Sequence, residues 1–221
     1  MATAGGAGKG LVLLRTIPLF HGVQDPQLEQ IARAATPRKV GRGTAIVRAG
    51  DVTDSLYILI SGSARVLNSD EEGREVILCI LGPGDFFGEM GLIDGSPRSA
   101  DVVAAEACEL LVISKTDFLC CLQENFEIAL NIMKCLVVRL RDADRKIESL
   151  ALMDVYGRVA KLLLDFSELL GGQRIVRRKL TRQDIAKMIG ASREMVSRVM
   201  KDLEGTGYIR IEDGQIVIDE R

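Results

Sequence analysis

The segment LTRQDIAKMIGASREMVSRVMKDLEGTGY, residues 180–208, decides how this chain is interpreted. Its apolar residues recur at helical spacing on both sides of Gly190, which predicts two short helices joined by a tight turn. They are Ile185, Met188, Ile189, Val196, Val199, Met200 and Leu203. Thr181 stands in an N-cap position with Asp184 three residues later, and Ser192 can cap the second helix. The pattern is typical of a helix-turn-helix, whose second helix enters the major groove of DNA.

The second predicted helix carries polar side chains at its beginning. Arg193 and Glu194 fall in its first turn, and Arg198 follows one turn later on the same face. An arginine fork matches O6 and N7 of guanine, and a carboxylate accepts a hydrogen bond from N4 of cytosine. We therefore predict that this helix reads DNA bases. The alternative is an ordinary surface helix pair whose charges face water.

The charge around the motif favours DNA binding. Residues 174–201 contain nine Lys or Arg and two acidic residues, a local charge of +7, whereas the whole chain carries −2. A basic segment in an otherwise acidic chain is typical of a phosphate-binding face, and Lys179 within it is a predicted phosphate contact for any DNA sequence. Residues 207–218, with Asp213-Gly214 at their centre, predict a hairpin that packs beside the helices as a wing.

Composition limits the remaining possibilities. With 221 residues, 47% of them hydrophobic and 27% charged, the chain is expected to form one or two domains with a buried core. No apolar run reaches the length of about 18 residues that a membrane span needs, and residues 1–15 are expected to be a flexible tail without a signal peptide. The chain is therefore expected to be cytoplasmic, without contact to a membrane.

The five cysteines and the single histidine, His21, offer no cluster of metal ligands. We therefore expect no metal, haem or iron–sulfur cluster, and no enzymatic activity, because a set of nucleophile and base is also missing. The cysteines lack CxxC spacing, which favours buried, reduced thiols. They are Cys79, Cys108, Cys120, Cys121 and Cys135. A redox pair at Cys120 and Cys121 is the alternative.

Residues from about 38 to 118 have a sequence pattern typical of β-strands. Short runs of apolar residues are separated by glycines at a spacing of roughly 8–12 residues, which predicts an antiparallel β-roll or jelly roll. The runs are residues 45–47, 56–60, 63–67, 76–81, 100–104 and 109–113. Before them, residues 16–35 predict short helices, one of which begins at Asp25-Pro26.

From about residue 114 to residue 150 the pattern is helical, with a seam at alternating spacings of three and four. Such a seam pairs two helices in a coiled coil. Its members are Leu130, Met133, Val137, Leu140, Asp144 and Ile147. A second helix is predicted from Asp154 to Leu170 and should end at Gly171-Gly172.

Residues 82–100, GPGDFFGEMGLIDGSPRSA, stand out within the β region. Their five glycines permit tight turns and close approach of the backbone to a ligand. An arginine and a serine beside free backbone N–H groups, here Arg98 and Ser99, make a phosphate cradle, and a nearby carboxylate such as Glu89 can accept from a ribose hydroxyl. The alternative is that Glu89 and Arg98 pair with each other and only close a turn.

The order of these parts resembles the CRP/FNR superfamily of bacterial transcription regulators over residues 16–219. The stretches that carry the resemblance are FGEMGLIDGSPRSA and TRQDIAKMIGASREMVSRVMKDLE. The resemblance implies an α+β fold with an antiparallel β-roll of the cyclic-nucleotide-binding type at residues 16–125. A long dimerisation helix at 126–152 and a winged helix-turn-helix at 153–221 would follow.

The resemblance also implies roles for single residues. Glu89 would bind the ribose 2′-hydroxyl, while Arg98, Ser99 and the backbone of Gly88 would hold a cyclic phosphate. Two further residues, Met90 and Gly91, belong to the same matched site.

On the DNA side the resemblance implies contacts to a TGTGA-like half-site. The residues facing the bases would be Arg193, Glu194, Ser197 and Arg198. Thr181 and Gln183 would contact phosphates. The family further implies a homodimer on a two-fold symmetric operator in double-stranded DNA, and RNA polymerase as another partner.

One position departs from the family pattern. Where cAMP-responsive members carry Thr-Ser on the long helix to read adenine, this chain has Ala143-Asp144. A carboxylate matches the N1–H and N2–H edge of guanine with two bonds and N6 of adenine with one, so we hypothesise that Asp144 helps to read the base. The alternative is that Asp144 pairs with Arg141 or Arg145 and reads nothing.

The expected effector is therefore a cyclic nucleotide, cAMP or cGMP. Cyclic di-GMP, or control without any ligand, are alternatives within the same architecture. A regulatory subunit that does not bind DNA is a further alternative, which the basic helix-turn-helix disfavours.

Overall fold

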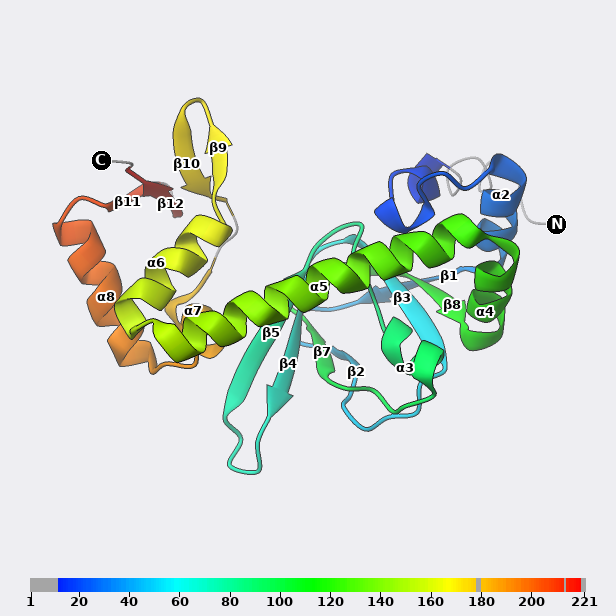
Figure 1. Cartoon of the computed structure of the whole chain (residues 1–221), viewed down its shortest axis with the longest axis horizontal. Helices are drawn as coiled ribbons and strands as arrows, with labels where there is room; N and C mark the ends of the chain where they lie inside the picture. Colours follow the sequence, from blue (N-terminus) through cyan, green and yellow to red (C-terminus); the bar gives the residue numbers. More distant parts are fainter. Residues whose placement is uncertain (1–11, 178–179, 213, 220–221) are drawn as a thin grey trace. The chain divides into compact units, whose positions relative to one another are not determined.

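The computed structural model describes residues 12–177, 180–212 and 214–219 (Figure 1). Two compact units divide the chain after residue 139, and helix α5 (Phe126–Leu152) runs continuously through this boundary. The first unit contains two antiparallel sheets and the second a helical core with one small sheet, so the predicted α+β class is confirmed.

The first unit is a roll of two four-stranded antiparallel sheets, with strand orders β1-β8-β3-β6 and β2-β7-β4-β5. The strands are β1 (Thr36–Val40), β2 (Ala45–Val47), β3 (Ser55–Ser61), β4 (Ala64–Ser69), β5 (Glu75–Leu81), β6 (Phe86–Phe87), β7 (Asp101–Ala104) and β8 (Cys108–Ser114). The six predicted runs are therefore confirmed as strands. The sequence did not reveal β1, whose Pro37 is tolerated because the strand lies at a sheet edge, or β6, which has two residues.

Strand β3 explains how the roll is packed. Leu56 and Ile58 lie in one apolar cluster, together with residues of the helices, whereas Tyr57 and Leu59 lie in a second cluster inside the roll. Because side chains alternate between the faces of a strand, a strand with apolar material on both sides must be apolar at every position. The uninterrupted run LYILI therefore marks the centre of this unit.

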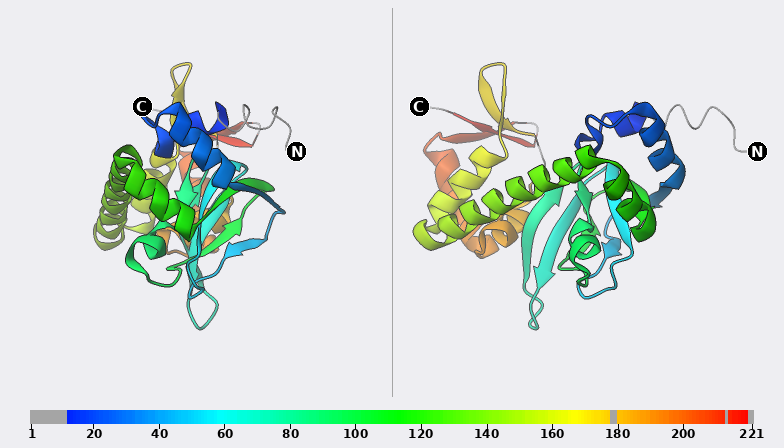
Figure 2. Two further views of the ribbon diagram at one scale, coloured as in Figure 1. Left: turned by 90° about the vertical axis from the view of Figure 1, so that its right-hand side faces the viewer. Right: turned by 45° about the vertical axis from the view of Figure 1, so that its right-hand side comes forward.

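Helices border the first cluster of the roll (Figure 2). They are the 3₁₀ turn η1 (Pro18–Phe20), α2 (Asp25–Ala34), α4 (Lys115–Glu124) and the beginning of α5, while α3 (Glu89–Asp94) lies between β6 and β7. The helical region predicted from residue 114 to 150 is thus interrupted once. Asn125 is extended and buried, and its backbone N–H and Nδ2 both donate to the carbonyl of Cys121, which ends α4.

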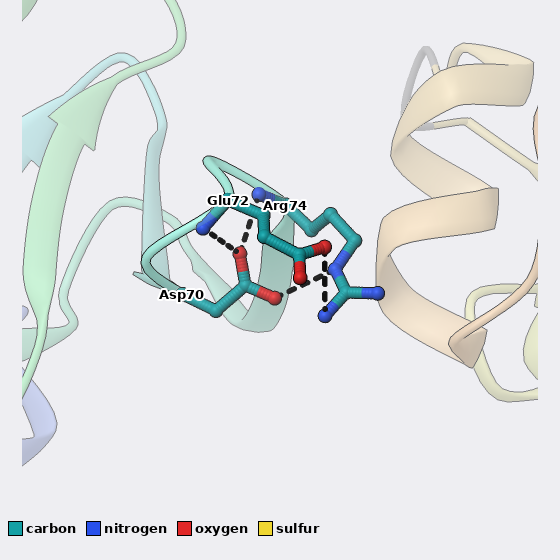
Figure 3. Close-up of polar contacts among 3 residues, drawn as sticks. All are labelled: Asp70, Glu72 and Arg74. Carbon is teal, nitrogen blue, oxygen red and sulfur yellow. Dashed lines mark hydrogen bonds and ion pairs between the residues drawn. The ribbon is translucent and has the colours of Figure 1, made fainter.

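The β4–β5 hairpin projects from the roll and is closed by a charged turn (Figure 3). Asp70 accepts from the backbone N–H groups of Glu72 at 3.0 Å and Arg74 at 2.8 Å, and also from Nε of Arg74 at 2.7 Å. The Arg74 side chain holds the pKa of Asp70 below its ordinary value. These groups are exposed to water, so they order the turn without forming part of a core.

The second unit packs helices α6 (Val155–Asp165), α7 (Arg182–Ile189) and α8 (Arg193–Gly205) around one apolar core. A four-stranded sheet of order β11-β12-β10-β9 accompanies them. Its strands are β9 (Glu168–Leu170), β10 (Gln173–Val176), β11 (Ile209–Glu212) and β12 (Gln215–Ile218). The predicted wing hairpin is confirmed as β11 and β12, although Asp213 of its turn lies outside the described residues.

The helix predicted from Asp154 to Leu170 is shorter than expected. It ends at Asp165, and the following residues form strand β9, which pairs with β10. Gly171 and Gly172 both have positive φ, 57° and 83°, and form the two-residue turn of this hairpin rather than a helix end. Pairing of β10 with both β9 and β12 outweighs the local helical pattern, a tertiary effect that local spacing cannot report.

Candidate effector site and DNA interface

The loop predicted to cradle a phosphate begins at Gly88, which caps α3 in the left-handed conformation, with φ at 87°. A Cβ atom at this position would lie 2.1 Å from Nη1 of Arg98 and 3.1 Å from the Ser55 carbonyl oxygen. Gly91 is equally confined, because a Cβ there would lie 2.2 Å from the Ser96 carbonyl oxygen. The glycines thus let two separate stretches of the loop close on one another.

Arg98 is a buried cation held by the backbone. Its Nη1 donates to the carbonyl of Gly88 at 2.9 Å and its Nη2 to the carbonyl of Ser55 at 2.7 Å. The guanidinium carbon lies 5.6 Å from the centroid of the Tyr57 ring, and Asp54, which is exposed, is 3.7 Å away. A guanidinium has five N–H donors, so donors remain beyond the two that these carbonyls engage.

Glu89 is buried as well, with 1% of its surface exposed, but its partner is not Arg98. Oε1 of Glu89 accepts from Nη1 of Arg139 on α5 at 2.6 Å. Arg139 also donates to the carbonyl of Phe86 and lies over the ring of that residue, 5.0 Å from its centroid. The turn-closing pair of Glu89 with Arg98, considered from the sequence, is therefore not formed.

Arg139 is the residue that sequence reasoning missed. Burial lowers its pKa and the Glu89 carboxylate raises it, and the net direction is upward, so the guanidinium of Arg139 stays charged. Arg139 is separated from Glu89 by 50 positions and lies next to the seam residue Leu140, where its side chain would have been assigned to the coiled coil. The sequence contained no local pattern that could connect this arginine to the glycine-rich loop.

The other predicted ligand residues differ in exposure. Ser99 is exposed beside Arg98, and Met90 is 52% exposed on α3, whereas Gly91 is buried. Asp144 is exposed on the part of α5 that belongs to the second unit. Of its two expected alternative partners, Arg141 and Arg145, the second pairs with Asp142 instead.

The DNA interface is built on strong local capping. Thr181 accepts from the backbone N–H of Asp184 at 3.0 Å, and its own hydroxyl donates to the Asp184 carboxylate at 2.7 Å, which confirms the capping box. Gly190 ends α7 in the left-handed conformation, and Ser192 caps α8 by accepting from the N–H of Met195 at 3.2 Å. Both helices therefore begin where the sequence predicted, and α7 ends at the predicted break.

The side chains predicted to meet DNA lie on the surface of this motif. Arg193, Glu194 and Arg198 are exposed and Ser197 is partly exposed, while Val196 between them is fully buried. The hydrogen bond with its own backbone N–H and that with Ser192 lower the pKa of Glu194, so it is ionised at neutral pH. Thr181 and Gln183 are exposed at the start of α7, and Lys179 lies outside the described residues.

The cysteine thiols bear on the redox pair considered at Cys120 and Cys121. All five cysteines are free, and burial raises the pKa of the Cys121 thiol to about 11. The hydrogen bond to Glu124 raises the pKa of Cys120 as well. Both thiols of this adjacent pair therefore stay protonated at neutral pH, which disfavours a redox role.

Two kinds of feature are absent from the described residues. No group of three or more His, Cys, Asp and Glu side chains is arranged there to hold a metal ion. No helix in that part of the chain combines the length and the apolar character that crossing a membrane requires.

Comparison with known proteins places both sites in known domain families. Residues 37–125 match the cyclic nucleotide-binding domain, and residues 157–221 match the Crp-like helix-turn-helix domain. The chain is 38% identical over 201 residues to the cAMP-activated global transcriptional regulator CRP of Pasteurella multocida, covering 88% of this chain and 95% of that protein. It is 36% identical over 212 residues to the cAMP-activated global transcriptional regulator Vfr of Pseudomonas aeruginosa, covering 91% and 98%.

Two solved structures extend the comparison. The c-di-GMP-responsive global regulator CLP of Xanthomonas campestris matches with a TM-score of 0.76 and 29% identity, over 90% of this chain and 100% of that one. The catabolite activator protein of Thermus thermophilus matches with a TM-score of 0.55 and 34% identity, over 92% and 94%.

Proposed function

Because this chain belongs to the CRP family of DNA-binding transcription regulators, we propose that a cyclic nucleotide bound in the β-roll controls its binding to DNA. The observation that carries the proposal is the pair of buried, oppositely charged groups on one loop, Arg98 and Glu89, each fixed by other parts of the fold. Burying two charges costs desolvation free energy that an apolar pair would avoid, so we infer that the charges bind something that an apolar pair could not. A ligand that has both an anionic phosphate and a sugar hydroxyl gives both a purpose.

In the proposed complex the cyclic phosphate is held by three groups. They are the N–H donors of Arg98 that do not bond to carbonyls, the hydroxyl of Ser99 and the backbone of Gly88. Glu89 already gives Oε1 to Arg139, so Oε2 accepts from the ribose 2′-hydroxyl. Gly91 and Met90 complete the loop, Gly91 through its close packing and Met90 at the surface.

We propose that the regulator acts as a homodimer formed along α5. The seam residues Met133, Val137, Leu140 and Ile147 are 50%, 48%, 63% and 65% exposed in the single chain. Such a row is expected to be covered by a second copy in a coiled coil. A two-fold dimer would present two recognition helices to a palindromic TGTGA-like operator.

At each half-site, base edges would be contacted by Arg193, Glu194, Ser197 and Arg198. Phosphates would be contacted by Thr181, Gln183 and Lys179. The Thr181 hydroxyl and its backbone N–H both donate to the Asp184 carboxylate already, so a phosphate contact would require one of these donors to turn away from Asp184. We propose RNA polymerase as a further partner. We also propose that the regulator acts in the cytoplasm and has no catalytic activity. A regulatory subunit that does not bind DNA is disfavoured by the match to the Crp-like helix-turn-helix domain.

The base of the effector is the open choice, and Asp144 bears on it. Of the two arginines named as its alternative partners, Arg145 pairs with Asp142, which leaves Arg141 as the alternative to reading the base. A carboxylate at the dimer seam fits the guanine edge better than adenine N6. We propose cAMP, which activates the relatives CRP and Vfr, or cGMP, whose guanine edge an Asp144 carboxylate would fit, as effector. The second candidate is cyclic di-GMP, which also carries guanine and to which the neighbour CLP responds.

The first test is calorimetric titration of the purified protein with cAMP, cGMP and cyclic di-GMP. We expect one of them to bind, and Arg98→Met to abolish that binding while Arg74→Met, at the exposed hairpin turn, leaves it intact. Binding of none of the three would refute cyclic-nucleotide control and leave a ligand-independent regulator.

Asp144 has a test of its own. Asp144→Ala should reduce the preference for a guanine effector over cAMP, whereas Asp142→Ala on the same helix should not. Unchanged affinity and preference in Asp144→Ala would remove Asp144 from the site.

A further inference from the structure

Two side chains from outside the helix-turn-helix approach its turn: Arg158, whose Nε is buried, and Leu150, which is 54% exposed. Gly190, which forms this turn, has φ at 63° and ψ at 48°. The nearest atoms to a Cβ at Gly190 would be Cδ2 of Leu150, at 3.7 Å, and Nη1 of Arg158, at 4.0 Å. Leu150 lies in the last turn of α5, and Arg158 lies in α6. The long helix and the helix that follows it therefore meet at the turn that precedes the recognition helix.

The contact made by Arg158 is a charged hydrogen bond. Nη1 of Arg158 donates to the carbonyl oxygen of Ile189 at 2.7 Å. Ile189 is the last residue of α7, so this carbonyl belongs to the helix end where unpaired acceptors and the negative end of the helix dipole lie. A guanidinium, which is always charged, binds such an acceptor more strongly than a neutral donor does.

The partly buried Arg158 side chain is less favourable for stability than an apolar side chain at the same position would be. In the described part of the chain, Nε of Arg158 is buried without a hydrogen-bond partner. An unpaired buried donor costs free energy, and an apolar side chain would avoid the cost. The core between α6 and α8 is already supplied by residues such as Val159, Leu163 and Met200. The guanidinium therefore contributes a directional hydrogen bond at the turn rather than apolar packing.

We propose that Arg158 and Leu150 form a clasp that positions the recognition helix α8 relative to α5. Arg158 fixes the end of α7 to α6, and Leu150 seats the last turn of α5 against Gly190. A movement of α5 then reaches the turn directly instead of being absorbed in a loose connection. The DNA-positioning part stands on the geometry of the second unit, and the effector-dependent part rests on the function proposed above.

The test compares two variants, each with a matched control on the same helix. Arg158→Met removes the charged donor, and its control Lys161→Met removes one charge from the same helix. Leu150→Ala removes the second contact, and its control Leu152→Ala truncates a residue that is 78% exposed in the same turn of α5. Each protein is titrated with the effector by calorimetry and with a palindromic TGTGA duplex and a random duplex, with and without effector.

We expect Arg158→Met and Leu150→Ala to bind the effector within about twofold of the parent protein. The factor by which the effector raises affinity for the palindromic duplex should fall by about tenfold, within the usual range of coupling between sites. Backbone amides of residues 190–195 should exchange faster with solvent. Arg158→Lys, which restores a charged donor, should recover part of the factor, and neither control should lose it.

Three results would overturn the clasp. One is full effector enhancement in Arg158→Met and Leu150→Ala. The second is equal loss of affinity for palindromic and random DNA together with a lower unfolding temperature, which would make Arg158 structural only. The third applies if the parent binds no effector, so that the proposed control fails. The clasp is then judged by the ratio of palindromic to random affinity and by amide exchange, and unchanged values in both variants would refute it.

Discussion

The glycine-rich loop and the recognition helix handle charge in opposite ways. In the loop, Arg98 and Glu89 are buried, and their bonds run to backbone carbonyls and to Arg139. On the recognition helix, Arg193 and Glu194 are exposed, and the apolar residues on its other face attach it to the core. The loop therefore depends on its charges for its own structure, whereas the helix only presents them.

The difference follows from what each site is proposed to recognise. A small ligand must be enclosed, so its recognising charges lie in a poorly solvated place where an unpaired group is costly. DNA approaches from outside, so its contacts can stay hydrated until binding. Substitutions in the loop should therefore change both folding and binding, and substitutions on the recognition helix should change binding alone.

The largest effect is expected for Arg139→Met. The change leaves the Glu89 carboxylate, 2% exposed, without its charged partner, and should lower the free energy of unfolding by about 3–4 kcal/mol. Chemical denaturation measures this. Arg74→Met breaks an exposed pair at the hairpin turn, whose arginine side chain is 75% exposed, and should cost less than about 1 kcal/mol. Equal losses of unfolding free energy in the two variants would mean that the buried ion pair of the loop is no more important for stability than the exposed pair of the hairpin turn.

The next effect separates two glycines of the same loop. Gly88→Ala meets both an unfavourable positive φ and the Arg98 guanidinium, and should cost about 2–3 kcal/mol and abolish effector binding. Gly95 has a positive φ of 78° with no atom within 4 Å of a Cβ, so Gly95→Ala should cost only about 1 kcal/mol. Denaturation and calorimetry measure both variants. Retained effector binding in Gly88→Ala would show that the close approach of Arg98 is dispensable.

On the recognition helix, Arg193→Ala should reduce affinity for the palindromic duplex by about 1–3 kcal/mol and relax selectivity at one base pair. Its free energy of unfolding should change by less than about 0.5 kcal/mol, because the side chain is exposed. Lys201→Ala, at another exposed position of α8, should weaken binding to all sequences alike. Fluorescence anisotropy at several salt concentrations distinguishes the two. Equal losses of Arg193→Ala on palindromic and random DNA would contradict base reading.

The smallest effect concerns a single proton. The pKa of Glu194 is lowered by its own backbone N–H and by Ser192, so its stabilising contribution is present above the ordinary value of 4.5 and is lost as pH falls through the lowered value. Ser192→Ala should therefore raise the pKa of Glu194 in an NMR titration. Ser114→Ala removes the cap of α4 instead and should leave that pKa unchanged. If Ser192→Ala does not move it, the exposed carboxylate is not preorganised by the cap.

The sequence by itself determined the helix-turn-helix, its caps at Thr181 and Ser192, and the break at Gly190. These features depend on hydrogen bonds between residues at most a few positions apart, so they are written in local spacing. The two motifs also indicated the family, and strand spacing indicated the roll.

Tertiary structure alone decided the rest. The pairing of Glu89 with Arg139, the edge strand β1 and the β9–β10 hairpin all depend on partners that other parts of the fold bring close. Asn125 interrupts an apolar helical pattern that continues on both of its sides. In each case a contact made through folding outweighs the local preference. A buried charge in particular acquires its partner only when distant elements meet, because no spacing along the chain encodes that meeting.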